Sequence, residues 1–205
     1  YGAAFTILQA DSLILGVLRG AEMVVEFVMV WKIAEIITLL LWKIPESLQP
    51  YLIEAHIAND RDRILRLYRA MWRGVFVLAL MAGVSYAVFG HWLVTLWVGS
   101  EHVSMPPWAF ILAGAAIFWL ALARVPALFS YALKRFRLLN QIVLVEVVAK
   151  LGAIAVLVPV LGFAAPFAAV CLIHVLGIAW GYIYIGKQLL PIPAGDAVAP
   201  AVRGN

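Results

Sequence analysis

Charged side chains inside long apolar runs are the residues of this sequence that could do chemistry. The run WKIAEIITLLLWKIPESLQP, residues 31–50, contains Lys32, Glu35, Lys43 and Glu46. At 100° per residue, these four side chains fall within one helical stripe about 80° wide, opposite a face of Phe, Val, Ile and Leu. Such side chains attract anions, bind protons or small cations, or pair with one another.

The depth of these charges in a membrane helix separates their roles. Lys43 and Glu46 lie near one end, where a long side chain can reach the interface. Lys32 and Glu35 lie near the middle and cannot both do so. Their i, i+3 spacing lets them neutralise each other, and the alternative is a polar cavity or a substrate.

Further charges interrupt other apolar runs. Glu146 and Lys150 have the i, i+4 spacing of a helical ion pair. Asp11 has no basic residue at contact spacing in its own helix, so we expect a partner from another helix, with Lys32 and Arg124 as candidates.

Each deep charge costs about 2.5–3.5 kcal/mol at a helix centre and therefore needs a partner or a wet cavity. We predict a polar cavity lined mainly by the first two spans, with buried structural pairs as the alternative. The candidate residues of a substrate or ion pathway are Asp11, Lys32, Glu35, Arg124, Glu146 and Lys150.

Motifs for catalysis are missing from the sequence. It contains no HExxH, GxSxG or P-loop pattern, and its four histidines do not form a metal-ligand set with Cys171. We therefore expect neither an enzyme nor a metal site. Cys171 is interpreted as a small buried hydrophobe. His174 is interpreted as a core histidine, with a proton carrier as the alternative.

The composition predicts an all-α integral membrane protein. Of 205 residues, 65% are hydrophobic and only 13% are charged, about half the charge that a soluble domain carries. Apolar stretches of bilayer-spanning length recur through the chain. We predict one six-helix lobe over residues 1–190, followed by a disordered cytoplasmic tail at 191–205. The spans are expected near 1–18, 22–44, 74–97, 107–132, 138–158 and 165–187, with an amphipathic cytoplasmic segment at 56–73.

The distribution of basic residues predicts the orientation. Ten lysines and arginines fall in the even-numbered connections and the C-terminal tail, against Arg19 alone on the other side. Loops rich in Lys and Arg stay in the cytoplasm, so the C-terminus should be cytoplasmic. The same topology explains the basic segment 56–73 without nucleic acid. The ten are Arg61, Arg63, Arg66, Arg69, Arg73, Lys134, Arg135, Arg137, Lys187 and Arg203.

Three stretches resemble the polysaccharide flippase branch of the multidrug/oligosaccharidyl-lipid/polysaccharide superfamily. QADSLILGVLRGAEMVVEFVMVWKIAEI (9–36) is similar to the family's seventh and eighth helices. SLQPYLIEAHIANDRDRILRLYRAMWR (47–73) is similar to its Pro-containing helix end and basic connection. LVPVLGFAAPFAAV (157–170) resembles its Pro-x-x-Gly turn, although Ala164, Ala165 and Pro166 stand where Gly-Ala-Ala is usual.

The resemblance implies the C-terminal half of a roughly twelve-helix carrier in the bacterial inner membrane. Such carriers flip an undecaprenyl-pyrophosphate-linked oligosaccharide by alternating access for surface polysaccharide synthesis. The chain opens on Tyr1 rather than Met, so we expect a fragment whose N-terminal half is its partner, together with membrane lipids.

Under this reading Lys32 and Arg124 attract the pyrophosphate. Asp11 and Glu35 bind a coupling proton or sodium ion, or hold the basic residues in place, and no other cofactor is expected. A drug or small-lipid exporter of the same superfamily is the first alternative. A membrane glycan polymerase or ligase and a structural partner of an assembly complex are the others.

Overall fold

The computed structural model describes residues 2–99, 105–134 and 136–178, and the regular structure in these ranges is entirely helical. The predicted tail at 191–205 and the end of the last predicted span lie outside them. The helices are α1 (Gly2–Arg19), α2 (Ala21–Ser47), α3 (Gln49–Ile57), α4 (Arg61–Val98), α5 (Pro107–Ala132), α6 (Phe136–Leu161), the 3-10 helix η2 (Gly162–Ala164), α7 (Ala165–Ile173) and the π-helix η3 (His174–Ile178).

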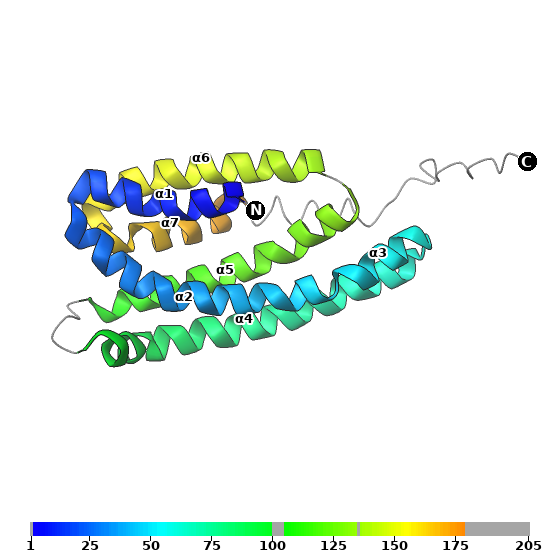
Figure 1. Cartoon of the computed structure of the whole chain (residues 1–205), viewed down its shortest axis with the longest axis horizontal. Helices are drawn as coiled ribbons and strands as arrows, with labels where there is room; N and C mark the ends of the chain where they lie inside the picture. The colour runs from blue at the N-terminus through cyan, green and yellow to red at the C-terminus, as the bar shows by residue number, and fades with distance from the viewer. Residues whose placement is uncertain (1, 100–104, 135, 179–205) are drawn as a thin grey trace, which may run out of the picture.

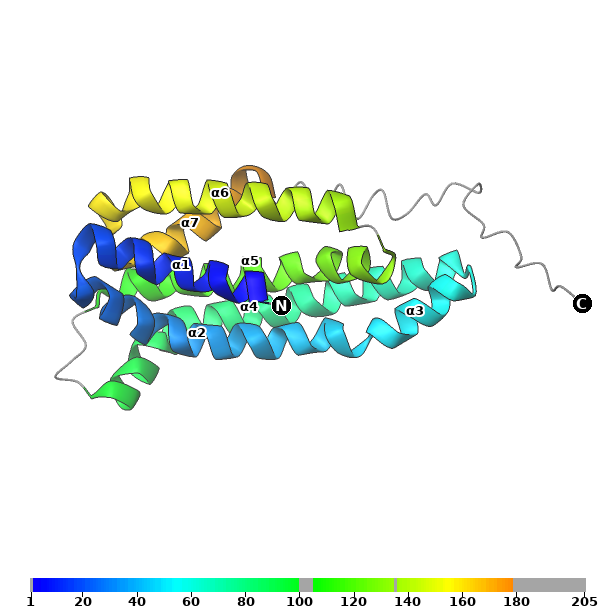
Figure 2. The same cartoon turned by 45° about the horizontal axis from the view of Figure 1, so that its top comes forward.

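The helices form an elongated bundle whose long axis most of them follow (Figure 1). α2 and α4 run along one side with α5 beside them, and α1, α6 and α7 form the other side. Figure 2, turned by 45°, keeps the same neighbours together. The α1–α2 and α6–η2 junctions lie at one end, and the α3–α4 and α5–α6 connections lie at the other. The basic connections therefore share one end of the bundle.

The closest helix contact joins α4 and α5. A Cβ atom added at Gly83 would lie 2.6 Å from the carbonyl oxygen of Gly114, and one added at Gly114 would meet the Gly83 carbonyl oxygen. No other residue type could stand at either position without moving a backbone. Small residues that bring backbones together are a common means of holding membrane helices to each other.

Proline and a left-handed residue shape the α2–α3–α4 corner. Pro45 lies in the last turn of α2, and α3 begins one residue after that helix ends. Asn59, with φ of 52°, turns the chain. Asp60 then caps α4 by accepting a 2.9 Å hydrogen bond from the Arg63 amide.

The sequence predicted an amphipathic segment at 56–73 that lies at the membrane interface. In the structure this segment does not form a helix of its own. Residues from Arg61 onward belong to α4, a continuous helix of 38 residues that is about 57 Å long at 1.5 Å per residue. The apolar face of this segment packs on protein: Ile64 and Met71 are buried, and the Tyr68 ring lies edge-on to Phe129 of α5 at 4.9 Å. α3 and the start of α4 extend past the ends of α5 and α6 (Figure 1).

Three helical stretches in the described ranges are long and apolar enough to cross a membrane, by length and composition: Arg61–Val98, Pro107–Ala132 and Leu139–Leu176. This indicates a membrane protein, but the six predicted spans are not confirmed. α2 is long enough but is not among these stretches, because charged residues interrupt its apolar sequence. Many large apolar side chains are exposed on the bundle, including Leu96, Val160 and Leu176 at 70% or more, as a lipid-facing surface requires.

Candidate functional site

A cavity of about 210 Å³ lies inside the bundle, between α1, α2, α5, α6 and α7. Among the described residues its wall is mainly apolar and aromatic, and Asp11, Arg124, Glu146 and Lys150 bring charges to it. α5 and α6 supply most of this described wall, and α1 contributes Asp11. The other lining residues are Phe27, Trp31, Trp42, Ala116, Leu120, Ala123, Ala127, Tyr131, Leu139, Val143, Val147, Pro166, Phe167 and Val170.

Asp11 of α1 and Lys150 of α6 form a buried ion pair across this cavity. The Lys150 ammonium lies 2.9 Å from Oδ1 of Asp11 and donates a 3.1 Å hydrogen bond to Oδ2. The side chains of Lys150 and Asp11 are only 8% and 7% exposed. Oδ1 lies in ionic contact but accepts no directed hydrogen bond from the described residues. The pair fastens α1 to α6.

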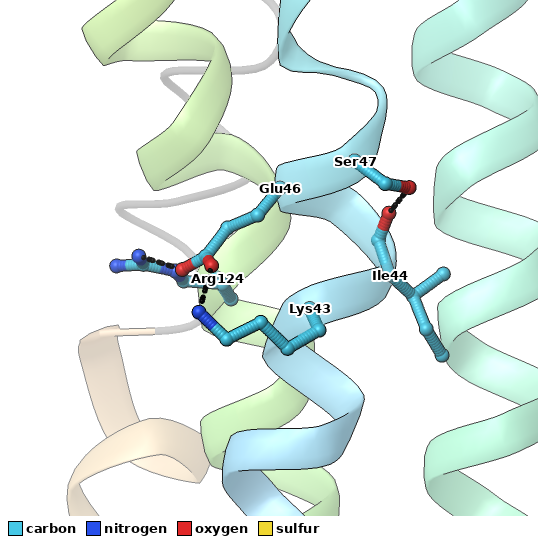
Figure 3. A network of polar contacts seen from close by, with 5 residues as sticks. All are labelled: Lys43, Ile44, Glu46, Ser47 and Arg124. Atoms are coloured by element: carbon cyan, nitrogen blue, oxygen red, sulfur yellow. Dashed lines mark hydrogen bonds and ion pairs between the residues drawn. The ribbon is translucent and has the colours of Figure 1, made fainter.

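A second charged cluster lies where α2 meets α5 (Figure 3). Glu46 accepts from Lys43 at 2.8 Å and from the Arg124 guanidinium at 2.6 Å. The hydrogen bond from Lys43 and the nearby Arg124 lower the pKa of the Glu46 carboxyl below its ordinary value. Arg124 also lies over the ring of Trp42, 5.0 Å from its centroid, an orientation that attracts a cation.

The guanidinium of Arg124 keeps one donor available. Its Nε is buried and has no hydrogen-bond partner among the described residues, although the Nη2 atom is engaged by Glu46. The side chain is 20% exposed and borders the cavity. A guanidinium with a free donor can bind an anionic oxygen without leaving its carboxylate partner.

Lys32 and Glu35 lie outside the cavity. They pair with each other at 2.9 Å, and the Lys32 side chain is 54% exposed on the outer face of α2. Lys43 is 75% exposed on the same face, which otherwise presents Ile36 and Leu40 to the surroundings. Two lysines thus project from an apolar face, each held by a glutamate three residues further along the chain.

Glu146 on α6 faces His174, which follows α7. The Glu146 Oε1 atom lies 3.7 Å from Nε2 of His174. His174 is 2% exposed, and its Nδ1 lies 2.9 Å from the carbonyl oxygen of Val170. Its ring also lies against Trp119 of α5, with centroids 6.0 Å apart. The histidine therefore connects the charged wall of the cavity to α7.

The sequence predicted part of this arrangement. Asp11 does take its partner from another helix, but that partner is Lys150, and both candidates named from the sequence are wrong. Lys32 instead pairs with Glu35, and Arg124 with Glu46. Asp11, Arg124, Glu146 and Lys150 share one cavity, whereas Lys32 and Glu35 do not reach it.

The sequence predicted a polar cavity lined mainly by the first two spans, whereas in the described residues this cavity is lined mainly by α5 and α6. The sequence also missed the contact between His174 and Glu146. They lie on different helices, and no spacing within one helix could have indicated it.

Aromatic rings close the end of the cavity next to α7. Phe167 lies 5.3 Å from Phe27 and 6.1 Å from Trp31, measured between ring centroids. The cavity thus combines these aromatic rings with charged side chains, a combination typical of sites for amphipathic molecules.

Metal binding finds no support in the described part of the chain, where no three His, Cys, Asp or Glu side chains come together as a ligand set. Comparisons with protein-family models, with curated proteins and with solved structures find no match to this chain.

Proposed function

We propose that this chain is one lobe of a flippase that moves a lipid-linked oligosaccharide across a membrane by alternating access. The observation that carries the proposal is the outer face of α2, where the side chains of Lys32 and Lys43 are 54% and 75% exposed among apolar neighbours. A charge facing lipid near mid-membrane costs about 2.5–3.5 kcal/mol. A face bordering an aqueous route would remove that cost.

The chemistry of this face suits an anionic lipid head group. Each lysine already holds a carboxylate at 2.8–2.9 Å, so an arriving phosphate oxygen would replace one anionic partner by another. The exchange keeps each lysine paired with an anion, and water in the route would solvate the displaced glutamate. Glu35 and Glu46 hold the lysines between substrates. Arg124, which shares Glu46 with Lys43, is the next cation beside this face.

The internal cavity has a different role in this proposal. Its volume of about 210 Å³ is below the roughly 300–1,000 Å³ of sites for drug-sized ligands. An oligosaccharide cannot enter it. The substrate route therefore runs along the outside of α2, against a second lobe, while the Asp11–Lys150 pair holds this lobe together as it moves.

We infer the orientation from the basic connections, which share one end of the bundle (Figure 1). That end would face the cytoplasm by the positive-inside rule, and the bacterial inner membrane is the compartment in which such a lipid-linked substrate is made.

A flipping assay tests the proposal. The complete protein is reconstituted in vesicles with a fluorescent polyprenyl-diphosphate oligosaccharide, and its movement between leaflets is followed by quenching. Lys32→Ala should slow flipping about tenfold or more, because a hydrogen bond to a charged group is worth about 1.5–3 kcal/mol. Val88→Ala, on the exposed surface of α4, is the matched control and should leave the rate unchanged. Equal rates in the two variants would refute the proposed role of Lys32.

An exporter of amphipathic cations is a second candidate, favoured by the aromatic wall of Phe27, Trp31 and Phe167. In this case the complete protein would lower the accumulation of a cationic dye in cells without any surface polysaccharide. Replacing Trp31 by Ala would abolish the effect, whereas Lys32→Ala would preserve it.

A further inference from the structure

The orientation of the His174 ring fixes the hydrogen on one of its nitrogens. Nδ1 lies 2.9 Å from the carbonyl oxygen of Val170, and a carbonyl oxygen only accepts. Nδ1 must therefore carry a hydrogen. In a neutral imidazole the other nitrogen, Nε2, then has a lone pair and no hydrogen.

That second nitrogen faces a carboxylate. Nε2 of His174 is buried, has no hydrogen-bond partner among the described residues, and lies 3.7 Å from Oε1 of Glu146. If both groups were in their neutral-pH reference forms, the lone pair of a buried imidazole would face a carboxylate oxygen. Such an arrangement is repulsive, and burial makes it more costly.

We propose that Glu146 and His174 hold one proton between them and form a proton-binding site at the wall of the cavity. With the proton on Nε2 the pair is an imidazolium and a carboxylate, and with the proton on Glu146 it is a neutral acid donating to a neutral imidazole. Both arrangements turn the repulsive contact into an attractive one, and both contain the same single proton. The proton belongs to the pair rather than to either residue.

The surroundings of the pair leave the proton a route and keep other charges engaged. Glu146 lines the cavity and so meets whatever water enters it, whereas His174 lies behind it. On α6 the neighbouring Lys150 is engaged by Asp11 of α1. From α5, Arg124 and Tyr131 also line the cavity, and the Trp119 ring covers the imidazole.

The other described elements bring mainly aromatic and apolar side chains to the site. The cavity residues of α2 are the aromatic Phe27, Trp31 and Trp42. On α7, the Cys171 thiol contacts the carbonyl oxygen of Leu112 at 3.7 Å. A proton fits the pair better than a metal ion, because no third ligand joins these two side chains in the described residues.

The site deepens the proposed function, on which its use as a coupling site for transport rests. Release of the proton would leave a carboxylate and a lone pair in contact, pushing α6 and the segment after α7 apart. Occupancy of the site would thereby favour one arrangement of these helices. The proposal thereby assigns the coupling proton to Glu146 and His174 in place of Asp11 and Glu35.

Spectroscopy on the complete protein in lipid nanodiscs tests proton occupancy without any transport substrate. Nitrogen-15 NMR of labelled histidines reports which ring nitrogens of His174 are protonated, with H174Q used to assign its signal. Infrared spectroscopy reports a protonated glutamate. At pH 7 we expect either a doubly protonated His174 or a protonated Glu146. In E146Q the nitrogen-15 signal of a doubly protonated His174 should revert to that of the neutral Nδ1–H form. In H174Q the infrared band of a protonated Glu146 should disappear.

Glu22→Gln is the matched control, because it removes an exposed carboxylate at the start of α2 and should leave the His174 signal unchanged. A neutral His174 beside an ionised Glu146 in the wild-type protein would overturn the proposal, as would an imidazolium that persists in E146Q. The wild-type spectra decide the question even if a variant fails to fold. If the pair binds a proton but the protein flips no lipid-linked oligosaccharide, the proposed function is refuted and the proton-binding site stands.

Discussion

Replacing Lys150 by Met tests whether the buried ion pair of Asp11 and Lys150 stabilises the fold. The side chains of Lys150 and Asp11 are 8% and 7% exposed, so the variant leaves a carboxylate buried without its cation. Breaking a buried pair in this way costs about 3–5 kcal/mol. We expect a loss of unfolding free energy of about 3 kcal/mol, at the lower end, because water entering the cavity can solvate the carboxylate.

The double variant Asp11→Leu/Lys150→Met removes both charges and fills the space with apolar atoms. Replacing a whole buried pair by residues of similar volume is often neutral or stabilising. We therefore expect its unfolding free energy to lie within about 1 kcal/mol of the wild type, well above the sum of the single losses.

The measurement is equilibrium unfolding by steric trapping in bicelles, applied to the wild type, both single variants and the double variant. Lys43→Met is the control, since its side chain is 75% exposed and such pairs contribute about 0–1 kcal/mol. A Lys150→Met loss no larger than that of the control would refute the reasoning. So would a double variant as unstable as the two single losses added together.

Three further predictions concern stability. Gly114→Ala should lower it by about 1–3 kcal/mol in the same assay, because the new Cβ meets the Gly83 backbone, whereas Gly74→Ala, with open space around it, should not destabilise. Asp60→Ala should lower the free energy of unfolding by about 1 kcal/mol, because it removes the N-cap of α4. Asp60→Asn should retain most of the stability that the cap contributes. Because its partners lower the pKa of Glu46 from 4.5, this group stabilises the fold above that pH and the stabilisation is lost as the pH falls through the folded value. Acid titration of unfolding should therefore show a smaller loss in Glu46→Gln than in the wild type.

The local pair of Lys32 and Glu35 could be predicted from the sequence, whereas the long-range partners of Asp11 and Arg124 could not. The i, i+3 spacing of Lys32 and Glu35 determines their proximity once a helix forms, and the structure shows that pair at 2.9 Å. The need of Asp11 for a partner on another helix also follows from the cost of a deep charge. Which helix supplies it depends on packing between α1 and α6, about which helical periodicity says nothing.

The continuous α4 shows a second limit. Charge density separated the basic segment 56–73 from the apolar span after it, but helix propagation depends on backbone geometry rather than on charge. No proline interrupts the sequence from Arg61 to Val98, and the single Gly74 near the change in composition costs only about 1 kcal/mol in a helix. The turn before Arg61, by contrast, carries Asn59 and Asp60, whose types do indicate a helix start.

The central claim is that the outer face of α2 borders an aqueous route, and cysteine accessibility measures this most directly. In a Cys171→Ala background, Lys32→Cys and Val88→Cys are each treated in intact membranes with a membrane-impermeant thiol reagent. Both positions are exposed on the bundle, one on the proposed route and one on α4. We expect rapid labelling of Lys32→Cys and none of Val88→Cys. Equal protection of both cysteines would place the outer face of α2 in lipid and exclude an aqueous route along it.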